Sequence, residues 1–327
     1  MSMDKSKIIM DVDTGSDDAI ALVMAMLDPG FDLLGICSVS GSIGIRPATE
    51  NTLKVVEACG KQDRVKVFRG CALPLAATLT PWTQQSSEIP GREKKGEIHP
   101  EHLPGPMPLI QEAPISAVQF YLDTLSAAEE HSVTLVSTGP LTNVAVAIRS
   151  DPGICGKVKE IIIMGGGNLV NDISPASEFN IWGDPEAAEI ILQSGCRITM
   201  ISLDATSKAC ITAEEVQMIR ALGTASAELV ADLIEQRAAS CARRDFKNAP
   251  VHDALAVCAA LHPEVLKDVP DCNVHVDIGG GYAYGQTVVD RRIRVIEEEQ
   301  NCRFALGADR DFFFRWIYSV LKDGRDR

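Results

Sequence analysis

The sequence predicts an α/β protein with a mostly parallel central sheet flanked by helices, folded as a single domain over residues 1–327. Short runs rich in β-branched residues alternate with helical patterns, and strands that alternate with helices form parallel sheets. Hydrophobic residues make up 46% of the 327 positions and charged residues 23%, which suits a soluble globular chain with a large core. The chain has no Pro-, Gly- or Ser-rich linker that would divide it into two domains.

Six short apolar runs are the predicted parallel strands. Each is followed by a turn and then by a helical pattern, and they occupy residues 7–10, 32–39, 65–68, 133–137, 158–164 and 197–203. A hairpin is predicted over residues 273–290, around the three glycines at 279–281. Strands and hairpin together predict a sheet that is parallel except toward the C-terminal end of the chain.

The predicted helices fill the intervals between these strands. The clearest one has Asp184 as its cap, Pro185 in its first turn and Gly195 after its end. The full set covers residues 17–27, 48–59, 116–130, 142–148, 185–192, 213–222, 225–244, 252–261 and 312–321.

Residues 78–114 interrupt this regular pattern. The segment is rich in Pro, Gly, Lys, Glu and His and has no apolar periodicity. Loops of this length inside a compact domain usually serve function. We therefore predict a divergent active-site loop at about 78–114, which could act as a lid.

Charge and composition exclude several classes of partner. The net charge of −14 disfavours nucleic-acid polymers and anionic membrane surfaces, and favours a small molecule or a metal ion. No apolar run is long enough to span a bilayer, and the polar start does not resemble a secretory signal, so a cytoplasmic location is predicted. The ten cysteines include no Cys-x-x-Cys pair and are predicted to be buried free thiols, as at Cys37 and Cys258.

The strongest local signal is an acidic turn at the end of the first strand. Asp11, Asp13, Asp17 and Asp18 all lie within eight residues. Such close carboxylates repel one another, and a hard divalent cation with oxygen ligands would offset the repulsion. Helix capping could explain Asp17 and Asp18, but it leaves the other two without a role.

Two other metal-binding motifs can be compared with this stretch. An EF-hand loop that starts at Asp13 fails at nearly every ligand position. A haloacid-dehalogenase-type phosphatase also begins with a strand that ends in Asp-x-Asp-x-Thr, which is close to Asp11-Val12-Asp13-Thr14-Gly15. That family needs a later Gly-Asp-x-x-x-Asp element, whereas Gly183-Asp184 is followed by Ala188 at the decisive place. The phosphatase is therefore the second hypothesis.

Four further loops follow predicted strands or begin helices, at residues 137–143, 164–168, 178–180 and 251–254. Each alone has a simpler explanation, such as a glycine turn or a helix cap. In an open parallel sheet, however, ligands bind beyond the carboxyl ends of the strands. All four loops can therefore converge on the acidic turn.

Taken together and in this order, these segments resemble the inosine-uridine-preferring nucleoside hydrolases. The resemblance extends from residue 7 to about residue 292, and its closing strand is similar to residues 285–290. The motifs that carry it are Asp11-Val12-Asp13-Thr14-Gly15-Ser16-Asp17-Asp18-Ala19, Thr138-Gly139-Pro140-Leu141-Thr142-Asn143, Met164-Gly165-Gly166-Gly167, Glu178-Phe179-Asn180, Asp184-Pro185-Glu186-Ala187-Ala188 and His252-Asp253.

The resemblance implies a calcium site and a catalytic base. Asp13, Asp18, the carbonyl of Thr138 and Asp253 would hold Ca²⁺, and the ion would activate a water molecule. Asp13 would also act as the general base that takes the proton of this water. The product would be ribose with inverted configuration and a free nucleobase.

The resemblance also implies a set of substrate contacts. Asp17 and Asn180 would bind the ribose hydroxyls, Glu178 would approach the far end of the sugar, and Met164 would pack beneath the ring. His252 matches a histidine that, in one branch of the family, protonates the departing base. Its ordinary pKa range suits this task.

The sequence departs from the family where the substrate would be recognised. Gly41-Ser42 and Asn171-Asp172 each replace a Gly-Asn pair near the sugar, so 5′-group recognition is open, although Asp172 stays among the predicted substrate-binding residues. The family's His-Gly-x-x-Gly element is missing, and His99 and His102 are the nearest candidates. Trp82 lies about where the purine-specific branch stacks a tryptophan on the base, but it could equally anchor the loop.

The predicted function is therefore hydrolysis of the N-glycosidic bond of a ribonucleoside. The alternatives are the phosphatase and a calcium-stabilised riboside-binding protein. Asp13 argues against pure binding, because binding alone does not need a carboxylate over an activated water. The resemblance further implies a homodimer or homotetramer, while the preferred nucleobase is not predicted.

Overall fold

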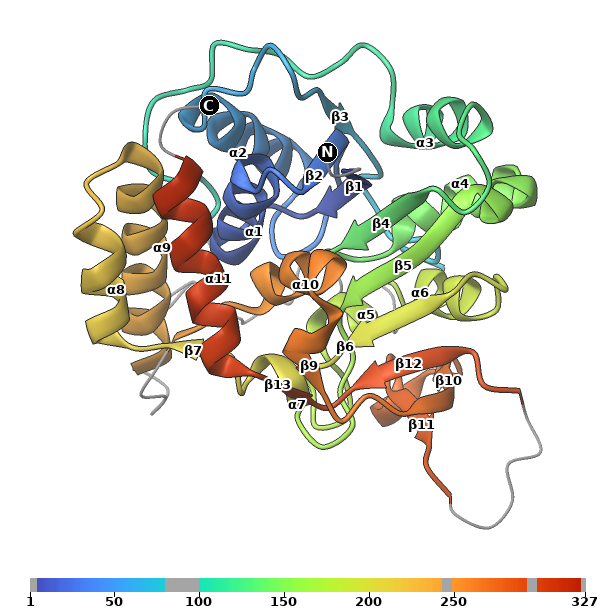
Figure 1. Ribbon diagram of the computed structural model, residues 1–327. Coiled ribbons are helices and arrows are strands. Elements are labelled where there is room, and N and C mark those ends of the chain that lie inside the picture. Colours follow the sequence, from blue (N-terminus) through green and yellow to red (C-terminus); the bar gives the residue numbers. More distant parts are fainter. Residues whose placement is uncertain (1–4, 80–99, 243–248, 293–298, 325–327) are drawn as a thin grey trace.

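The computed structural model describes residues 5–79, 100–242, 249–292 and 299–324. In this part of the chain, a nine-stranded sheet runs through the molecule in the order β11-β10-β12-β6-β5-β4-β1-β2-β3 (Figure 1). Neighbouring strands from β3 to β12 are parallel, and in this sheet only β10 pairs antiparallel, with β12 on one side and with the edge strand β11 on the other. The predicted α/β class with a mostly parallel sheet is confirmed.

Six of the seven parallel strands in the described chain agree closely with the predicted apolar runs, and the seventh, at residues 302–305, was not predicted. The parallel ones are β1 (Ser6–Val12), β2 (Phe31–Ser38), β3 (Val67–Arg69), β4 (Val133–Ser137), β5 (Val158–Met164), β6 (Ile198–Ile201) and β12 (Cys302–Ala305). The predicted hairpin is present as β10 (Asp271–Val276) and β11 (Thr287–Asp290). Four two-residue strands form small separate ladders: β7 (Cys210–Ile211), β8 (Ala249–Pro250), β9 (Leu266–Lys267) and β13 (Gly307–Ala308).

Nine of the described α-helices correspond to predicted ones, with differences at their ends, and two short helices at residues 179–183 and 203–206 were not predicted. They are α1 (Ser16–Leu27), α2 (Ile45–Ala58), α3 (Ala117–Ser126), α4 (Thr142–Ser150), α5 (Phe179–Gly183), α6 (Pro185–Leu192), α7 (Leu203–Thr206), α8 (Ala213–Arg220), α9 (Ala225–Ala242), α10 (His252–Leu261) and α11 (Arg310–Asp323). α3 ends four residues earlier than predicted, because Glu129 and Glu130 would face the negative end of its dipole. α11 begins two residues earlier, since Asp309 caps it by accepting from the Phe312 N–H at 3.0 Å.

Helices cover both faces of the sheet, so its strands are buried on both sides. Along β1, Ile8, Met10 and Val12 face one core and Ile9 faces the other, as the two-residue period of a strand requires. Every residue of α1 is buried, because this helix packs against α9, α10 and α11 as well as against the sheet. The first turn of α1 is therefore a rigid, enclosed platform.

The strand order places a topological switch point beside β1. The chain leaves β1 for β2 on one side and later returns to β4 on the other side. At such a point the connections diverge and leave a crevice beyond the carboxyl ends of the strands. The acidic turn after β1 lies at this crevice.

The long loop after β3 is partly described. Residues 100–115 contain no helix or strand and are fastened to α2, where Asn51 Oδ1 accepts from the Leu103 N–H at 2.8 Å. Glu57 Oε1 accepts from the Leu109 and Ile110 N–H groups, both at 2.8 Å. Trp82 and His99 lie outside the described residues, so their predicted roles and the lid remain predictions.

Two further sequence predictions can be compared with the described chain. No helix in the described ranges is long and apolar enough to cross a bilayer. The cysteines whose side chains are described, including the buried Cys37 and Cys258, are free thiols, as predicted.

Candidate active site

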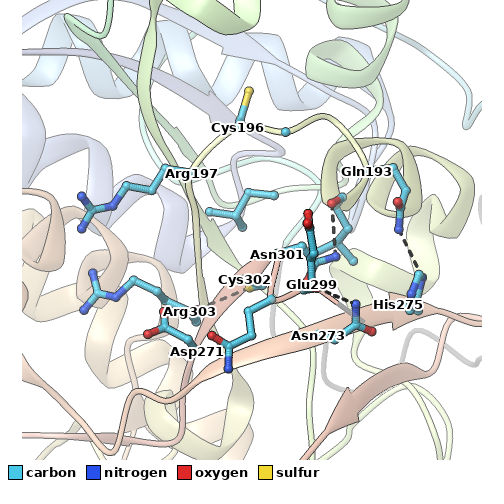
Figure 2. A pocket seen from close by; sticks show the side chains of 14 residues that line it. Gln193, Cys196, Arg197, Asp271, Asn273, His275, Glu299, Asn301, Cys302 and Arg303 are labelled. Atoms are coloured by element: carbon cyan, nitrogen blue, oxygen red, sulfur yellow. Dashed lines mark hydrogen bonds between the residues drawn. The ribbon is translucent and has the colours of Figure 1, made fainter. Parts of the chain in front are cut away.

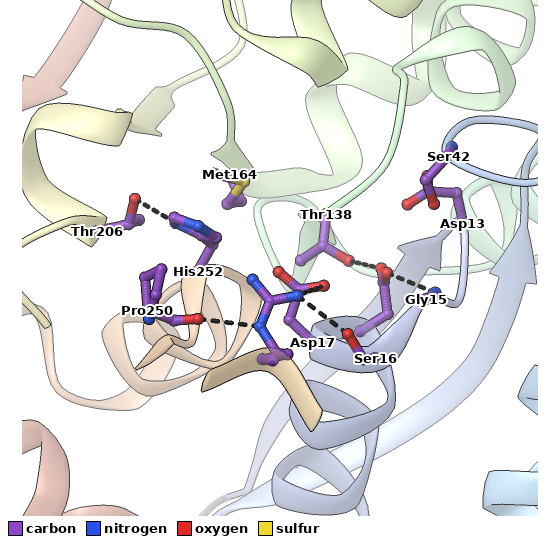
Figure 3. A network of polar contacts seen from close by, with 12 residues as sticks. Asp13, Gly15, Ser16, Asp17, Ser42, Thr138, Met164, Thr206, Pro250 and His252 are labelled. Carbon is purple, nitrogen blue, oxygen red and sulfur yellow. Dashed lines mark hydrogen bonds and ion pairs between the residues drawn. The ribbon is translucent and has the colours of Figure 1, made fainter. Parts of the chain in front are cut away.

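The candidate active site lies where the carboxyl ends of β1, β4 and β5 meet the amino ends of α1, α5 and α10. Polar side chains from most of these segments are held by defined contacts, and Figure 3 shows those around Thr138, Asp17 and His252. Asp13 follows β1, Thr138 follows β4, and Met164 ends β5. Asn180 and Asp253 lie in the first turns of α5 and α10.

Asp13 is enclosed by two glycine-containing loops. Its Oδ2 accepts a hydrogen bond from the Ser42 backbone N–H at 2.5 Å, and its side chain is almost completely buried. A side chain at Gly41 would overlap Asp13 Oδ2, and one at Gly139 would lie 3.1 Å from Asp13 Oδ1. Both glycines are thus needed for the close approach of the backbone to this carboxylate.

Asp18 is anchored by the helix start and by the loop after β4. Its Oδ2 accepts from the Gly15 N–H at 3.0 Å, which closes the first turn of α1. Its Oδ1 accepts from the Thr138 hydroxyl at 2.8 Å. The capping role considered for this residue is therefore real, but it coexists with a contact to a second loop of the site.

Asp17, Asp18 and Asp253 form a buried acidic cluster. Each offers a carboxylate oxygen, and these three atoms lie within 4.8 Å of one another. Burial, followed by the charge of Asp13, raises the pKa of Asp18 well above its ordinary value. Burial, followed by the charges of Asp17 and Asp18, does the same for Asp253. A cation with oxygen ligands would relieve this repulsion.

Asp13 is close enough to add to the repulsion on Asp18 and Asp253, but it does not belong to the three-residue cluster. Its carboxylate is turned toward Ser42 and away from Asp17 of the cluster (Figure 3). The structure thus separates one carboxylate from the other three.

Asn180 connects the loops after β4 and β5. Its Nδ2 donates to the Thr138 carbonyl at 2.8 Å and to the Met164 carbonyl at 3.1 Å, and it lies 3.4 Å from Met164 Sδ. The predicted residues Thr138, Met164 and Asn180 are therefore brought together. A carbonyl oxygen has a second lone pair, so Thr138 can accept from Asn180 and still face a cation.

Glu178 is the N-cap of α5 and is buried. Its carboxylate accepts from the backbone N–H groups of Gly166, Asn180 and Ile181 at 2.9, 2.9 and 3.1 Å. Burial, and next the charge of Asp172, raises its pKa from 4.5 to about 8, against the opposite effect of the three donors. Asp172 itself is exposed, so it lies at the rim of the site.

His252 is the first residue of α10 and directly precedes Asp253. Its Nδ1 lies 2.7 Å from the hydroxyl of Thr206 at the end of α7. The half-buried imidazole is near Met164 in Figure 3. The contact with Thr206 therefore joins α10 to α7 and fixes the imidazole of His252 through Nδ1.

Ser42, Asn171 and His102 lie where the sequence departs from the family motifs, and their surroundings differ. The Ser42 hydroxyl and Asn171 Oδ1 are buried and have no hydrogen-bond partner within the described chain. His102 lies 3.1 Å through Nδ1 from Glu50 Oε1 on α2 and is largely exposed. Two buried polar groups thus stand where the sequence leaves sugar recognition open.

Arg237, on α9, is a site residue that was not predicted. It is only 2% exposed, and its Nη1 lies 2.9 Å from Asp17 Oδ1. The sequence does carry a signal for it, since Arg237 continues the helical spacing of Ala227, Val230 and Ile234, which are fully buried. A charged residue on such an apolar stripe indicates a buried partner.

Asp184, the acidic residue of the phosphatase hypothesis, has a structural role. Its Oδ1 accepts from the Ala187 N–H at 3.1 Å and caps α6. Its Oδ2 accepts from the Thr142 hydroxyl at 2.6 Å and from the Leu75 N–H at 2.9 Å. These contacts account for Asp184 without a phosphate or a metal ion.

A large open cavity of about 1120 Å³ lies at the opposite end of the sheet (Figure 2). It is next to the amino ends of β6 and β12, and its lining includes Cys196, Arg197, His275 and Arg303. None of the predicted catalytic, metal or substrate residues lines it. Its size therefore gives no reason to move the candidate site away from the acidic cluster.

Comparison with known proteins agrees with the resemblance found in the motifs. The sequence model described as inosine-uridine preferring nucleoside hydrolase matches residues 8–315. The pyrimidine-specific ribonucleoside hydrolase RihB of Escherichia coli (strain K12 / DH10B) is 34% identical, with 98% of each chain covered.

Solved structures give the same answer. The purine-preferring ribonucleoside hydrolase from Gardnerella vaginalis is 26% identical with a TM-score of 0.85, and the match covers 98% of this chain and 99% of that one. The plant nucleoside hydrolase PpNRh1 has the same coverage, 24% identity and a TM-score of 0.87, which shows a shared fold. With a family match across nearly its whole length, the chain belongs to the inosine-uridine preferring nucleoside hydrolase family, and the enzyme is a ribonucleoside hydrolase, an N-glycosidase.

Proposed function

We propose that this enzyme hydrolyses ribonucleosides with Asp13 as general base and with calcium as its metal ion. The observation that carries the proposal is the meeting of the buried Asp17, Asp18 and Asp253 carboxylates at the switch point, next to Asp13. A riboside has several hydroxyl groups and a bond that water can cleave. The site accordingly offers acceptors for the hydroxyls and a base for the water.

The side chains fit a calcium ion. Asp13, Asp18, Asp253 and the Thr138 carbonyl would hold it, and all four are hard oxygen donors of the kind that calcium takes in irregular arrangements. The raised pKa values of Asp18 and Asp253 show how strongly the surroundings resist uncompensated negative charge. When bound, calcium would lower the pKa of a water molecule and orient the ribose hydroxyls.

Asp13 suits the role of base because its position is fixed. The Ser42 N–H holds Oδ2, and Gly41 and Gly139 enclose the side chain. A carboxylate held in this way can take a proton from water on one face of the sugar without reorganising. A single attack by water gives ribose with inverted configuration at the anomeric carbon.

The remaining contacts would orient the substrate and assist the departing base. Asp17 and Asn180 would bind the ribose hydroxyls, with Glu178 toward the far end of the sugar and Met164 beneath the ring. Protonation of the base would come from His252, whose Nδ1 is held by Thr206 and whose other ring nitrogen would act.

Recognition of the 5′ end of the sugar would involve the departures from the family motifs. The Ser42 hydroxyl and Asn171 Oδ1 are buried and have no partner within the described chain, and a polar substituent would satisfy both. Asp172, at the rim, would take part in the same recognition.

For the base itself, the curated relative at 34% identity is pyrimidine-specific, whereas a structural relative at 26% identity is purine-preferring. The higher identity favours a pyrimidine ribonucleoside as the substrate. A homodimer or homotetramer, which sedimentation would detect, also remains part of this proposal.

Incubation with uridine, cytidine, inosine, adenosine and guanosine in calcium-containing buffer tests the reaction and the base preference together. Free base and reducing sugar should appear, fastest with uridine or cytidine, and D13A should abolish the release while the circular dichroism spectrum stays unchanged. Faster release from inosine or guanosine would reverse the base assignment. Near-normal turnover by folded D13A would refute the role of Asp13. No release from any nucleoside would instead favour a riboside-binding protein.

A further inference from the structure

Arg237 is a buried cation on the apolar face of α9. It occupies the helical stripe formed by Ala227, Val230 and Ile234. A guanidinium in such a place is unfavourable unless it is paired and hydrogen-bonded. Arg237 meets this condition through contacts that all lead into the candidate active site.

These contacts join two distant segments of the chain. Nη1 of Arg237 lies 2.9 Å from Asp17 Oδ1 and donates to the Ser16 hydroxyl at 3.1 Å. Nε donates to the Pro250 carbonyl at 3.0 Å. Ser16 and Asp17 begin α1, and Pro250 closely precedes His252 and Asp253 (Figure 3). One side chain therefore ties the first acidic turn to the start of α10.

The ion pair distinguishes Asp17 from its neighbours in the acidic cluster. Asp18 contacts Gly15 and Thr138, on the side of the site that faces β4. Asp17 is held instead toward α9 by Arg237. By distance alone, Asp17 is as well placed for a cation as Asp18 or Asp253, because all three offer oxygens within 4.8 Å. The cation of Arg237 therefore competes with a metal ion for Asp17, with which it forms its ion pair, while its charge also acts on Asp253 without an ion pair.

We propose that Arg237 is a positioning residue that holds Asp17 for the ribose hydroxyls and withholds it from the metal ion. This inference rests on the proposed function, because it assigns the roles of two carboxylates within that site. The planar guanidinium of Arg237 suits the task, since Nη1 contacts both Asp17 and Ser16 while Nε donates to the Pro250 carbonyl, in directions that the rigid plane fixes. A lysine would keep the charge but not this geometry.

The test combines two readouts, calcium affinity by titration calorimetry with the metal alone, and KM and kcat with uridine. R237M should raise KM about tenfold or more with a smaller change in kcat, since the ribose contact is made in the bound substrate and in the transition state alike. R237M should also bind calcium at least as tightly as wild type, because Asp17 becomes available to the ion. A merely structural role would lower calcium affinity, kcat and stability together.

A double-mutant cycle with Asp17 isolates the pair. D17N should raise KM to a similar extent, and D17N/R237M should show no added loss, because both single changes remove the same interaction. R237K should restore calcium affinity to that of wild type and KM only in part. If R237M does not fold, R237K and D17N carry the comparison. Additive losses in KM would overturn the proposal, as would weaker calcium binding by folded R237M.

Arg220 provides a matched control. It lies on α8 and contacts Asp232 and Glu235 of α9 at 2.8 and 2.9 Å, on the partly exposed side. R220M removes a cation from the same helix pair, and should leave KM and calcium affinity unchanged.

Wild-type protein that binds calcium but releases no base would refute the proposed function, and the calcium titrations would still decide the role of Arg237. Normal hydrolysis with an unchanged KM in R237M would refute the role of Arg237 alone.

Discussion

Gly41 leaves room for the proposed general base, so replacing it with alanine tests the geometry of the site directly. The added methyl group would overlap Asp13 Oδ2 and lie 2.7 Å from both Asp13 Cγ and Pro140 Cδ. Gly139 confines Asp13 on the other side, because even a methyl group there would come within 3.1 Å of Oδ1. Asp13 therefore has to rotate away and lose the hydrogen bond from the Ser42 N–H.

The size of the effect follows from the displacement. Ordinary carbon–oxygen contacts require a shift of roughly 1 Å, and a misplacement of roughly 1 Å can cost about a hundredfold in rate. We expect kcat for uridine to fall about a hundredfold in G41A, which corresponds to about 2.7 kcal/mol in the barrier. The strain should cost about 1–3 kcal/mol of stability, measured by urea unfolding.

Gly44, three residues further on, is the matched control. The nearest atoms to a methyl group there are Pro47 Cδ and Cγ, at 3.9 and 4.0 Å, and the backbone has an ordinary extended conformation. G44A should keep kcat near that of wild type and change stability by no more than about 0.5 kcal/mol. Folded G41A with the kcat of G44A would refute the reasoning, because the proposed base would then tolerate displacement.

Three further predictions concern the metal ion, the proton donor and the pH dependence. Removal of divalent ions with EGTA should lower the activity and the Tm, and added calcium should restore both; an enzyme unaffected after exhaustive dialysis would contradict the calcium site. H252A should slow the hydrolysis of uridine far more than that of p-nitrophenyl riboside, whose leaving group needs no proton, and equal losses would exclude His252 as the donor. Burial, and next the charge of Asp172, raises the pKa of Glu178 from 4.5 to about 8. The folded protein therefore keeps the Glu178 carboxyl protonated at pH values where the unfolded chain has already lost this proton. The free energy of unfolding should consequently decline as the pH rises from about 4.5 to about 8. Between pH 5 and pH 9, E178Q should lose less unfolding free energy in urea than wild type, by up to about 4 kcal/mol at roughly 1.4 kcal/mol per pKa unit, and parallel profiles would contradict the shift.

The parallel part of the fold could be predicted because its strands carry their own signal. In β1, four of the five residues from Ile8 to Val12 are apolar, all but Asp11, and they are buried on both faces of the sheet. β12 (Cys302–Ala305) was missed because its four residues are too few for their pattern to indicate a strand. This strand exists through its pairing with β6 and β10, about 100 and 30 residues away in the chain. Long-range pairing of this kind leaves little trace in a local pattern.

In the candidate site, too, local motifs could be predicted from the sequence, whereas contacts between distant segments could not. Asp13, Asp18, Thr138 and Asp253 were predicted from the family motifs at strand ends and helix starts, and the sheet topology brings these segments to the same crevice. The hydrogen bond from the Ser42 N–H to Asp13 could not be predicted from the sequence, because every residue except proline has a backbone N–H and the side chain does not indicate where it points. Arg237 was missed for a different reason, since its partner is 220 residues away in the chain.

The separate contacts of Asp17 and Asp18 follow from helix geometry. Successive residues in an α-helix point about 100° apart, so two neighbouring carboxylates can contact different partners even where one oxygen of each lies close to the other. In the first turn of α1, this rotation directs Asp18 toward Thr138 and the end of β4, and Asp17 toward Arg237 of α9. The two adjacent residues thus place one carboxylate, that of Asp18, on the side of β4 and the other, that of Asp17, on the side of α9. Asp17 and Asp18 could exchange partners only if α1 began at a different residue. Arg237 of α9 can therefore act on Asp17 without disturbing the contact of Asp18 with Thr138.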